Sequence, residues 1–161
     1  NPLYDFEHAV ERVAAAREAV DKSGSGVVLT ARAECFLTGH PDPLKEASRR
    51  IEAYAKAGAD VLYAPGPKTL DDMKAIVAAA GGKPVNILVH ADFGLSVDEI
   101  ASTGARRISI GGALARAAWS AFIAATETIA EEGRFSGFAG NSKSAPLTQF
   151  LRDDLRERSR R

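Results

Sequence analysis

The fold is decided by residues 57–66, Ala57-Gly58-Ala59-Asp60-Val61-Leu62-Tyr63-Ala64-Pro65-Gly66. Gly58 stands where the end of a helix favours a residue free to take positive φ. The run Asp60 to Ala64 is predicted to be a strand, and Pro65-Gly66-Pro67 a loop. Thr69 is a good N-cap for the helix that follows. This stretch therefore indicates a helix, a buried strand and a second helix in succession.

The same order recurs on both sides of this unit. The predicted strands cover residues 27–30, 60–64, 85–89 and 107–110, the first of them buried on both faces. The predicted helices cover residues 7–20, 43–57, 70–80 and 113–131, with one more between Ser96 and Gly104, where Ser96 and Glu99 form a capping box. Strands that recur roughly every 25–35 residues are typical of βα units with parallel strands and outer helices. Trp119, Phe122 and Ile123 have helical spacing and are predicted to be core.

The repeating pattern stops after Gly133. Residues 134–161 are predicted to be a linker followed by an amphipathic helix over residues 145–158, separate from the α/β domain at residues 1–133. No other segment remains to pair with the apolar stripe of this helix, which is formed by Leu147, Phe150, Leu151 and Leu155. We expect the helix to dock on a neighbouring subunit or on structure outside this chain.

Composition excludes several classes of partner. The 21 basic and 21 acidic residues give zero formal net charge, which offers no attraction for nucleic acid or an anionic membrane. No apolar run approaches the roughly 18 residues that span a bilayer. The single cysteine, Cys35, excludes an internal disulfide and fits a cytoplasmic location. A start at Asn1 without Met suggests missing upstream residues.

Ligands of parallel α/β folds bind at the C-terminal ends of the strands. Arg32 and Glu34 follow the first predicted strand and, two residues apart, point to the same side. Arginine can bind a carboxylate or phosphoryl group with two parallel hydrogen bonds, and glutamate can hold the arginine or accept a proton. A surface ion pair is the alternative.

The other strand ends are less specific. Residues 63–67 are predicted to be a stiff wall. His90 with Asp92 is predicted to be a solvated loop rather than an acid–base pair or half of a metal site. Asn86, inside a strand, either ties the interior together or points at a ligand. Ser109 with Gly111 and Gly112 opens a helix whose backbone amides suit an anion, although close packing explains the glycines equally well. The chain contains no HExxH, GxxxxGK[ST], GxSxG or GxGxxG motif.

Five segments, in order and spacing, resemble the isocitrate lyase/phosphoenolpyruvate mutase superfamily, and its bacterial phosphoenolpyruvate mutase-like branch most of all. These segments are Pro2-Leu3-Tyr4-Asp5-Phe6, Leu29-Thr30-Ala31-Arg32-Ala33-Glu34, Ala57 to Gly66, Lys83-Pro84-Val85-Asn86 and Arg106 to Arg116. The resemblance implies a (β/α)₈ TIM-type barrel, of which this chain is the C-terminal half, strands five to eight. It also implies a terminal helix exchanged between the subunits of a dimer or tetramer.

The resemblance further implies an enzyme that forms or cleaves a C–C or P–C bond of a small α-keto acid or phosphonate through an enolate stabilised by Mg²⁺. Arg32 matches the arginine that binds the substrate carboxylate, Glu34 the acidic residue after it, and Asn86, Ser109, Gly111 and Gly112 are expected to line the site. The metal ligands are expected in the missing N-terminal half. Pro65 stands where the mutases have His and the lyases Glu. An inactive half-barrel scaffold or a keto-acid-binding homologue is therefore the alternative.

Overall fold

The computed structural model describes residues 2–140 and 144–159, which fall into two compact units that divide between Leu114 and Ala115. The elements of the first unit alternate as predicted: α1 (Phe6–Ser23), β1 (Thr30–Arg32), α2 (Pro43–Lys56), β2 (Val61–Tyr63), α3 (Leu70–Ala79), β3 (Val85–Leu88), α4 (Val97–Ser102) and β4 (Arg107–Ser109). The helix α5 (Ala113–Glu132) starts at the end of this unit and runs into the second, which adds η1 (Ser136–Phe138) and α6 (Ser144–Arg158). The assignment of residues 1–133 to half of a barrel stays a prediction.

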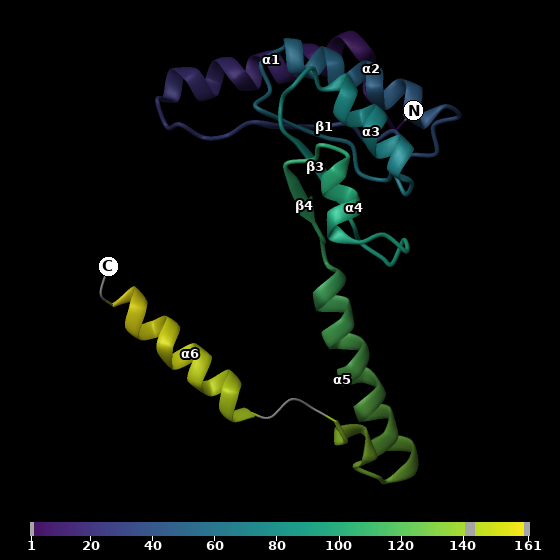
Figure 1. The fold of residues 1–161 in the computed structure, drawn as a ribbon, viewed down its shortest axis with the longest axis vertical. Coiled ribbons are helices and arrows are strands. Elements are labelled where there is room, and N and C mark those ends of the chain that lie inside the picture. Colours follow the sequence, from purple (N-terminus) through teal and green to yellow (C-terminus); the bar gives the residue numbers. More distant parts are fainter. Residues whose placement is uncertain (1, 141–143, 160–161) are drawn as a thin grey trace. The chain divides into compact units, whose positions relative to one another are not determined.

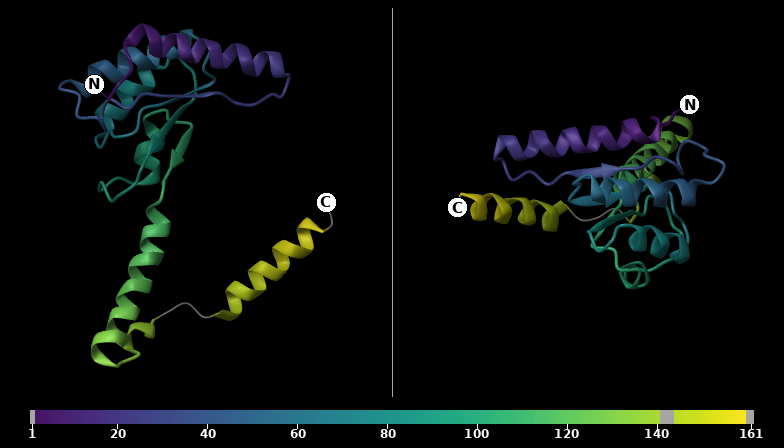
Figure 2. Two further views of the ribbon diagram at one scale, coloured as in Figure 1. Left: turned by 180° about the vertical axis from the view of Figure 1, so that it is seen from behind. Right: turned by 90° about the horizontal axis from the view of Figure 1, so that it is seen from above.

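The four strands form one parallel sheet in the order β1-β2-β3-β4, which confirms the predicted α/β class. The helices α2 and α3 pack on the sheet, while α1 packs against α2 and α4 against α3 (Figures 1 and 2). Because side chains alternate along a strand, the sheet has two different faces. One face packs under these helices, and we call the other the open face.

The core lies between the sheet and its helices. Ala31, Leu62 and Ile87 occupy the strand positions that face the helices, and all three are buried. They pack in one buried cluster with side chains of α2, α3 and α4, namely Ile51, Met73, Ile76 and Ile100. Each fully buried side chain of this size contributes roughly 1.5–3 kcal/mol relative to an exposed one. This layer holds the strand ends in place.

The predicted helix boundaries are confirmed at their caps. Gly58 takes φ +100° immediately after the C-cap of α2, as expected of the residue that ends that helix. The hydroxyl of Ser96 accepts from the Glu99 N–H at 3.2 Å, and the Glu99 carboxylate accepts from the Ser96 N–H at 2.7 Å. That reciprocal pair is the predicted capping box.

The predicted first strand is wrong in its position. The sequence predicts a buried strand over residues 27–30, but β1 begins at Thr30, and Val27 and Val28 are 57% and 62% exposed. Among the described residues, β1 pairs only with β2, and that register begins at Thr30 opposite Val61. Apolar character therefore predicted a strand at Val27 and Val28, which precede the residues that pair with β2.

The core assignment of Trp119, Phe122 and Ile123 is also wrong, because these side chains of α5 are 61%, 58% and 48% exposed. Helical spacing shows which residues share a stripe, but it does not show what covers that stripe. The apolar stripe of α6 is exposed as well. The exchange of that helix between subunits stays a prediction.

Candidate functional site

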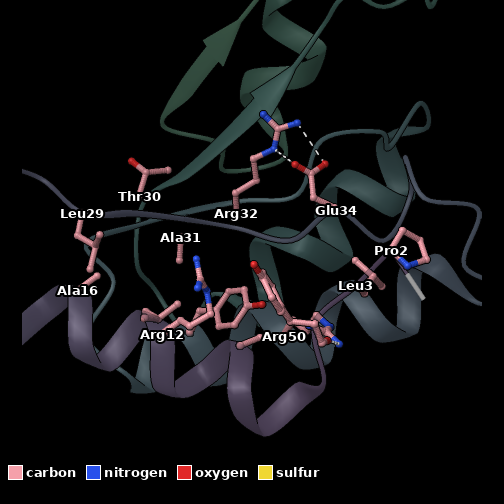
Figure 3. A pocket seen from close by; sticks show the side chains of 14 residues that line it. Pro2, Leu3, Arg12, Ala16, Leu29, Thr30, Ala31, Arg32, Glu34 and Arg50 are labelled. Atoms are coloured by element: carbon pink, nitrogen blue, oxygen red, sulfur yellow. Dashed lines mark hydrogen bonds and ion pairs between the residues drawn. The ribbon is translucent and has the colours of Figure 1, made fainter.

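Arg32 and Glu34 lie at the C-terminal end of β1 and form the predicted pair. Arg32 Nε lies 2.5 Å from Glu34 Oε1, and Nη2 donates to Oε2 at 3.1 Å. Figure 3 shows both side chains on the opposite side of the strand from Ala31 and Arg50, and therefore on the open face. Both remain partly exposed, with 46% and 38% of the side-chain surface accessible. The pair is thus accessible to a ligand.

A line of polar side chains crosses the open face from Arg32. The strand register aligns Arg32 with Tyr63, Tyr63 with Asn86, and Asn86 with Arg107. We call these four residues the open-face row. The Arg32 guanidinium carbon lies 5.1 Å from the centre of the Tyr63 ring, a cation–π distance, so the arginine leans from β1 toward β2.

Asn86 and Ser109 are brought together by β3 and β4, as the site prediction requires. Asn86 Nδ2 donates to Ser109 Oγ at 2.9 Å, and Ser109 Oγ donates in turn to the Ile87 carbonyl at 3.4 Å. Asn86 is only 1% exposed, and its Oδ1 has no hydrogen-bond partner among the described residues. A buried acceptor of this kind normally finds a partner. Asn86 lines an open hollow of about 510 Å³ together with Tyr63, Arg107, Ser109 and Gly111.

The glycine turn after β4 opens the helix α5, as predicted. Gly111 takes φ +52°, and the N–H of Ala113 donates to the Ile110 carbonyl at 3.1 Å. That bond uses one of the amides offered to an anion in the first turn of α5. Gly112 lies between the two and leads directly into the helix.

The end of β2 is a rigid packing element. Pro65 is fully buried, and Gly66 takes φ +124° with its α-carbon so close to Phe36 that an added Cβ would lie 2.2 Å from the Phe36 Cβ. The loop after β2 is therefore fixed against the loop after β1. This agrees with the predicted wall.

His90 and Asp92 do not form an acid–base pair. The Asp92 Oδ1 accepts from the Gly94 N–H at 2.7 Å, which closes a local turn. The His90 ring packs edge-on against Phe93, with 5.4 Å between the ring centres. Both of these contacts lie within the loop after β3.

The carboxylates at the strand ends do not make a magnesium site. The described residues contain no group of three or more His, Cys, Asp or Glu side chains that could hold a metal ion. Glu34 is paired with Arg32, and Asp92 belongs to another strand end. Cys35 is fully buried, and burial raises the pKa of its thiol, so it stays protonated and unreactive.

A cavity of about 360 Å³ between α1 and β1 has charged side chains that already have structural partners (Figure 3). Arg50 is buried, donates to Glu46 Oε1 at 2.7 Å and to the Tyr4 carbonyl at 2.9 Å, and ties α2 to the N-terminal segment. Burial opposes the charge of Glu46, but the hydrogen bond from Arg50 leaves the pKa of that carboxyl below its usual value. Arg12 stacks on Tyr4 at 4.6 Å.

Arg107 is the site residue that the sequence reasoning missed. It is exposed, lies two residues before Ser109 on β4, and lines the same hollow as Asn86. The alternation of side chains along a strand was a signal for it, because residues two apart share a face. Only the register, however, places it in the open-face row.

No helix of the described residues has the length and apolar character needed to cross a membrane. None of the curated proteins matches the chain significantly. Several solved structures do. One is a provisionally named lyase/mutase from Burkholderia cenocepacia J2315, which is 40% identical over 93% of this chain and 54% of its own, with a TM-score of 0.84. A phosphonopyruvate hydrolase is 29% identical over 98% of this chain and 56% of its own, with a TM-score of 0.67.

A 2,3-dimethylmalate lyase of the PEP mutase/isocitrate lyase superfamily shares the fold, with 23% identity over 99% of this chain and 56% of its own and a TM-score of 0.76. This chain spans about half the length of these solved structures. The sequence profile described as phosphoenolpyruvate phosphomutase matches residues 1–130. The chain therefore belongs to the phosphoenolpyruvate phosphomutase family.

Proposed function

We propose that the protein containing this chain forms or cleaves a C–C or P–C bond of a small α-keto acid or phosphonate through an enolate. The observation that carries the proposal is the Arg32–Glu34 pair at the end of β1, on the open face of a sheet with this family's fold. Relatives named as a phosphonopyruvate hydrolase and a 2,3-dimethylmalate lyase support this class of substrate.

The geometry of the pair suits a carboxylate clamp. A guanidinium has five N–H groups, and Glu34 takes one from Nε and one from Nη2. The edge formed by Nη1 and the remaining N–H of Nη2 is left for two parallel hydrogen bonds to a ligand carboxylate. Glu34 therefore orients Arg32, and Arg32 binds the substrate and stabilises the negative charge that develops next to its carboxylate.

The other predicted residues would shape the pocket. Asn86 and Ser109 are joined by a hydrogen bond across β3 and β4, and Gly111 lines the same hollow, with Gly112 next to it in the chain. Mg²⁺ is proposed only for the whole protein, since the described residues do not supply its ligands. A cytoplasmic homo-oligomer is likewise proposed for the whole protein.

Turnover by the full-length protein tests this proposal. It should be assayed with Mg²⁺ against oxaloacetate, methylisocitrate and phosphonopyruvate, beside Arg32→Ala and the matched variant Arg106→Ala, which removes an exposed arginine outside the open-face row. We expect one substrate to turn over and Arg32→Ala to lower kcat/KM by about 100-fold or more, since a charge-assisted clamp is lost. A kcat/KM that is unchanged in Arg32→Ala would contradict the proposal.

Pro65 favours a second candidate, a keto-acid-binding homologue without lyase or mutase activity. A buried proline cannot take part in proton transfer or bind a metal at the end of β2. Titration with oxalate in the presence and absence of Mg²⁺ separates the two. Tight Mg²⁺-dependent oxalate binding without turnover of any of the three substrates would favour the binding protein, and no oxalate binding would favour the scaffold.

A further inference from the structure

Arg107 is a cation on the open face for which the described residues offer no partner. Its guanidinium makes no ion pair, hydrogen bond or ring contact among the residues that the structure describes, and its side chain is exposed. Other arginines that the fold uses are held: Arg17 by Asp21 and Asp60, and Arg50 by Glu46. Arg107 is therefore not explained by the packing of the first unit.

A second observation at the same place points to a ligand. Asn86, the neighbour of Arg107 in the open-face row, is 1% exposed and has an Oδ1 without a hydrogen bond among the described residues. Its amide is oriented by Ser109, whose proton goes to the Ile87 carbonyl, so Nδ2 is the group that faces Ser109. Oδ1 is left as an acceptor without a partner among the described residues, in a side chain that lines the same hollow as Arg107.

An acceptor and a cation side by side can act as Glu34 and Arg32 do. An arginine that donates one N–H to Asn86 Oδ1 still presents others to an anion. The free acceptor is therefore suited to orient Arg107, while the guanidinium supplies the charge.

The two arginines are spaced for one small ligand. Arg32 and Arg107 stand on the first and fourth strands of the sheet, and three strand spacings place their α-carbons about 14 Å apart. Arg32 already leans across β2, because its guanidinium carbon lies 5.1 Å from the Tyr63 ring centre. Because an arginine side chain is long, Arg107 can extend across Asn86 toward Arg32, and the space between the two guanidinium groups then suits a ligand a few carbon atoms long.

We propose that Arg107 is a second anion-binding residue on the open face, and that together with Arg32 it selects ligands with an anionic group at each end. This inference rests on the proposed function insofar as both use the open face, but it concerns binding and needs no turnover. Arg32 binds one end of the ligand, Arg107 binds the other, and Asn86 orients Arg107.

The experiment is a calorimetric titration of the full-length protein at low salt with succinate and butyrate, which have the same number of carbon atoms and differ in one carboxylate. We expect succinate to bind at least about tenfold more tightly than butyrate, because a charge-assisted bond contributes that much. Arg107→Gln should reduce this preference to less than about threefold, chiefly by weakening the binding of succinate.

Arg106→Gln is the matched control, since it removes the same charge from the adjacent residue, which precedes β4. It should leave the preference unchanged. Arg107→Lys provides a second variant if Arg107→Gln does not fold: it keeps the charge without the planar fork, and the preference should fall at least about threefold. Equal binding of the two ligands by the unaltered protein overturns the proposal, as does a preference that survives in the Arg107 variants.

These outcomes are distinguishable from those of the turnover assay. If the protein converts none of the three substrates but loses its succinate preference in Arg107→Gln, this inference stands and the proposed activity is wrong. If the protein turns over one of them and the Arg107 variants bind succinate as the unaltered protein does, the proposed activity stands and this inference is wrong.

Discussion

At the scale of single residues, the loop ends are fixed by contacts that tolerate little change. Gly66 follows β2 with φ +124°, a conformation that L side chains rarely adopt, and its α-carbon abuts Phe36 from the loop after β1. Phe36 comes two residues after Glu34, so the contact helps to hold the segment that carries the clamp. The exposed Gly81 has positive φ as well, +60°, but nothing lies within 4 Å of where its Cβ would be.

Gly66→Ala should therefore destabilise the protein by about 3 kcal/mol or more, since backbone strain and a steric clash act together. Gly81→Ala, the control, should cost only about 1 kcal/mol because it meets the strain without the clash. Urea unfolding of the full-length protein measures both. Equal losses for the two variants would show that the contact with Phe36 does not matter.

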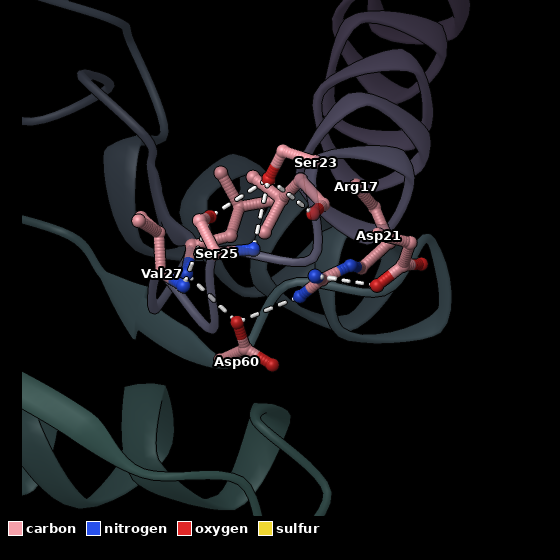
Figure 4. A network of polar contacts seen from close by, with 8 residues as sticks. Arg17, Asp21, Ser23, Ser25, Val27 and Asp60 are labelled. Atoms are coloured by element: carbon pink, nitrogen blue, oxygen red, sulfur yellow. Dashed lines mark hydrogen bonds and ion pairs between the residues drawn. The ribbon is translucent and has the colours of Figure 1, made fainter.

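At the scale of elements, one carboxylate joins α1, the approach to β1 and the start of β2. Asp60 Oδ2 accepts from the Leu29 N–H at 2.7 Å and from Arg17 Nη1 at 2.8 Å, while Arg17 also binds Asp21 at 2.6 Å (Figure 4). The Leu29 N–H and the Arg17 charge lower the pKa of Asp60. A lowered pKa in the folded state means that the ionised form stabilises the fold.

This stabilisation is present above the unfolded-state pKa of Asp, about 3.9, and is lost as the pH falls through the lower folded-state value. Asp60→Asn should therefore unfold at lower urea than the unaltered protein at pH 7, and the difference should shrink below about pH 4. The control Glu11→Gln removes an exposed carboxylate of α1 that makes only a 4.0 Å contact with His8. A pH-independent difference for Asp60→Asn would contradict the assigned role.

The elements also show what sequence could and could not predict. Local chemistry was sufficient for the caps at Gly58 and Ser96, because those bonds join residues close in the chain. The start of β1 was misplaced, since a strand is defined by pairing with Val61, 31 residues beyond Thr30. The Arg32–Glu34 pair could be predicted from spacing along one strand. The open-face row could not, because it depends on the register of four strands, and Arg107 was missed for that reason.

At the scale of the whole molecule, much apolar surface lacks a cover among the described residues. The stripe of α6 formed by Leu147, Phe150, Leu151 and Leu155 is exposed, with each side chain more than half accessible. An exposed apolar stripe of this kind commonly marks an interaction surface. The proposed homo-oligomer would cover it.

Leu151→Glu should therefore shift the full-length protein from oligomer to monomer, because a charge would be buried in the subunit contact. Sedimentation velocity would show this as a lower mass of the sedimenting species. Arg152→Glu, on the adjacent exposed position, should leave the mass unchanged. A monomeric unaltered protein, or an oligomer that Leu151→Glu does not weaken, would contradict the proposed contact.

The central claim is that the open face, with Arg32 at its edge, is the ligand-binding face of this fold. A crystal structure of the full-length protein grown with oxalate and Mg²⁺ tests it most directly. We predict an oxalate carboxylate about 3 Å from Arg32 Nη1 and Nη2, with Glu34 still bound to Nε. Oxalate bound on the helix side of the sheet, or an Arg32 side chain with no contact to bound oxalate, would contradict the claim.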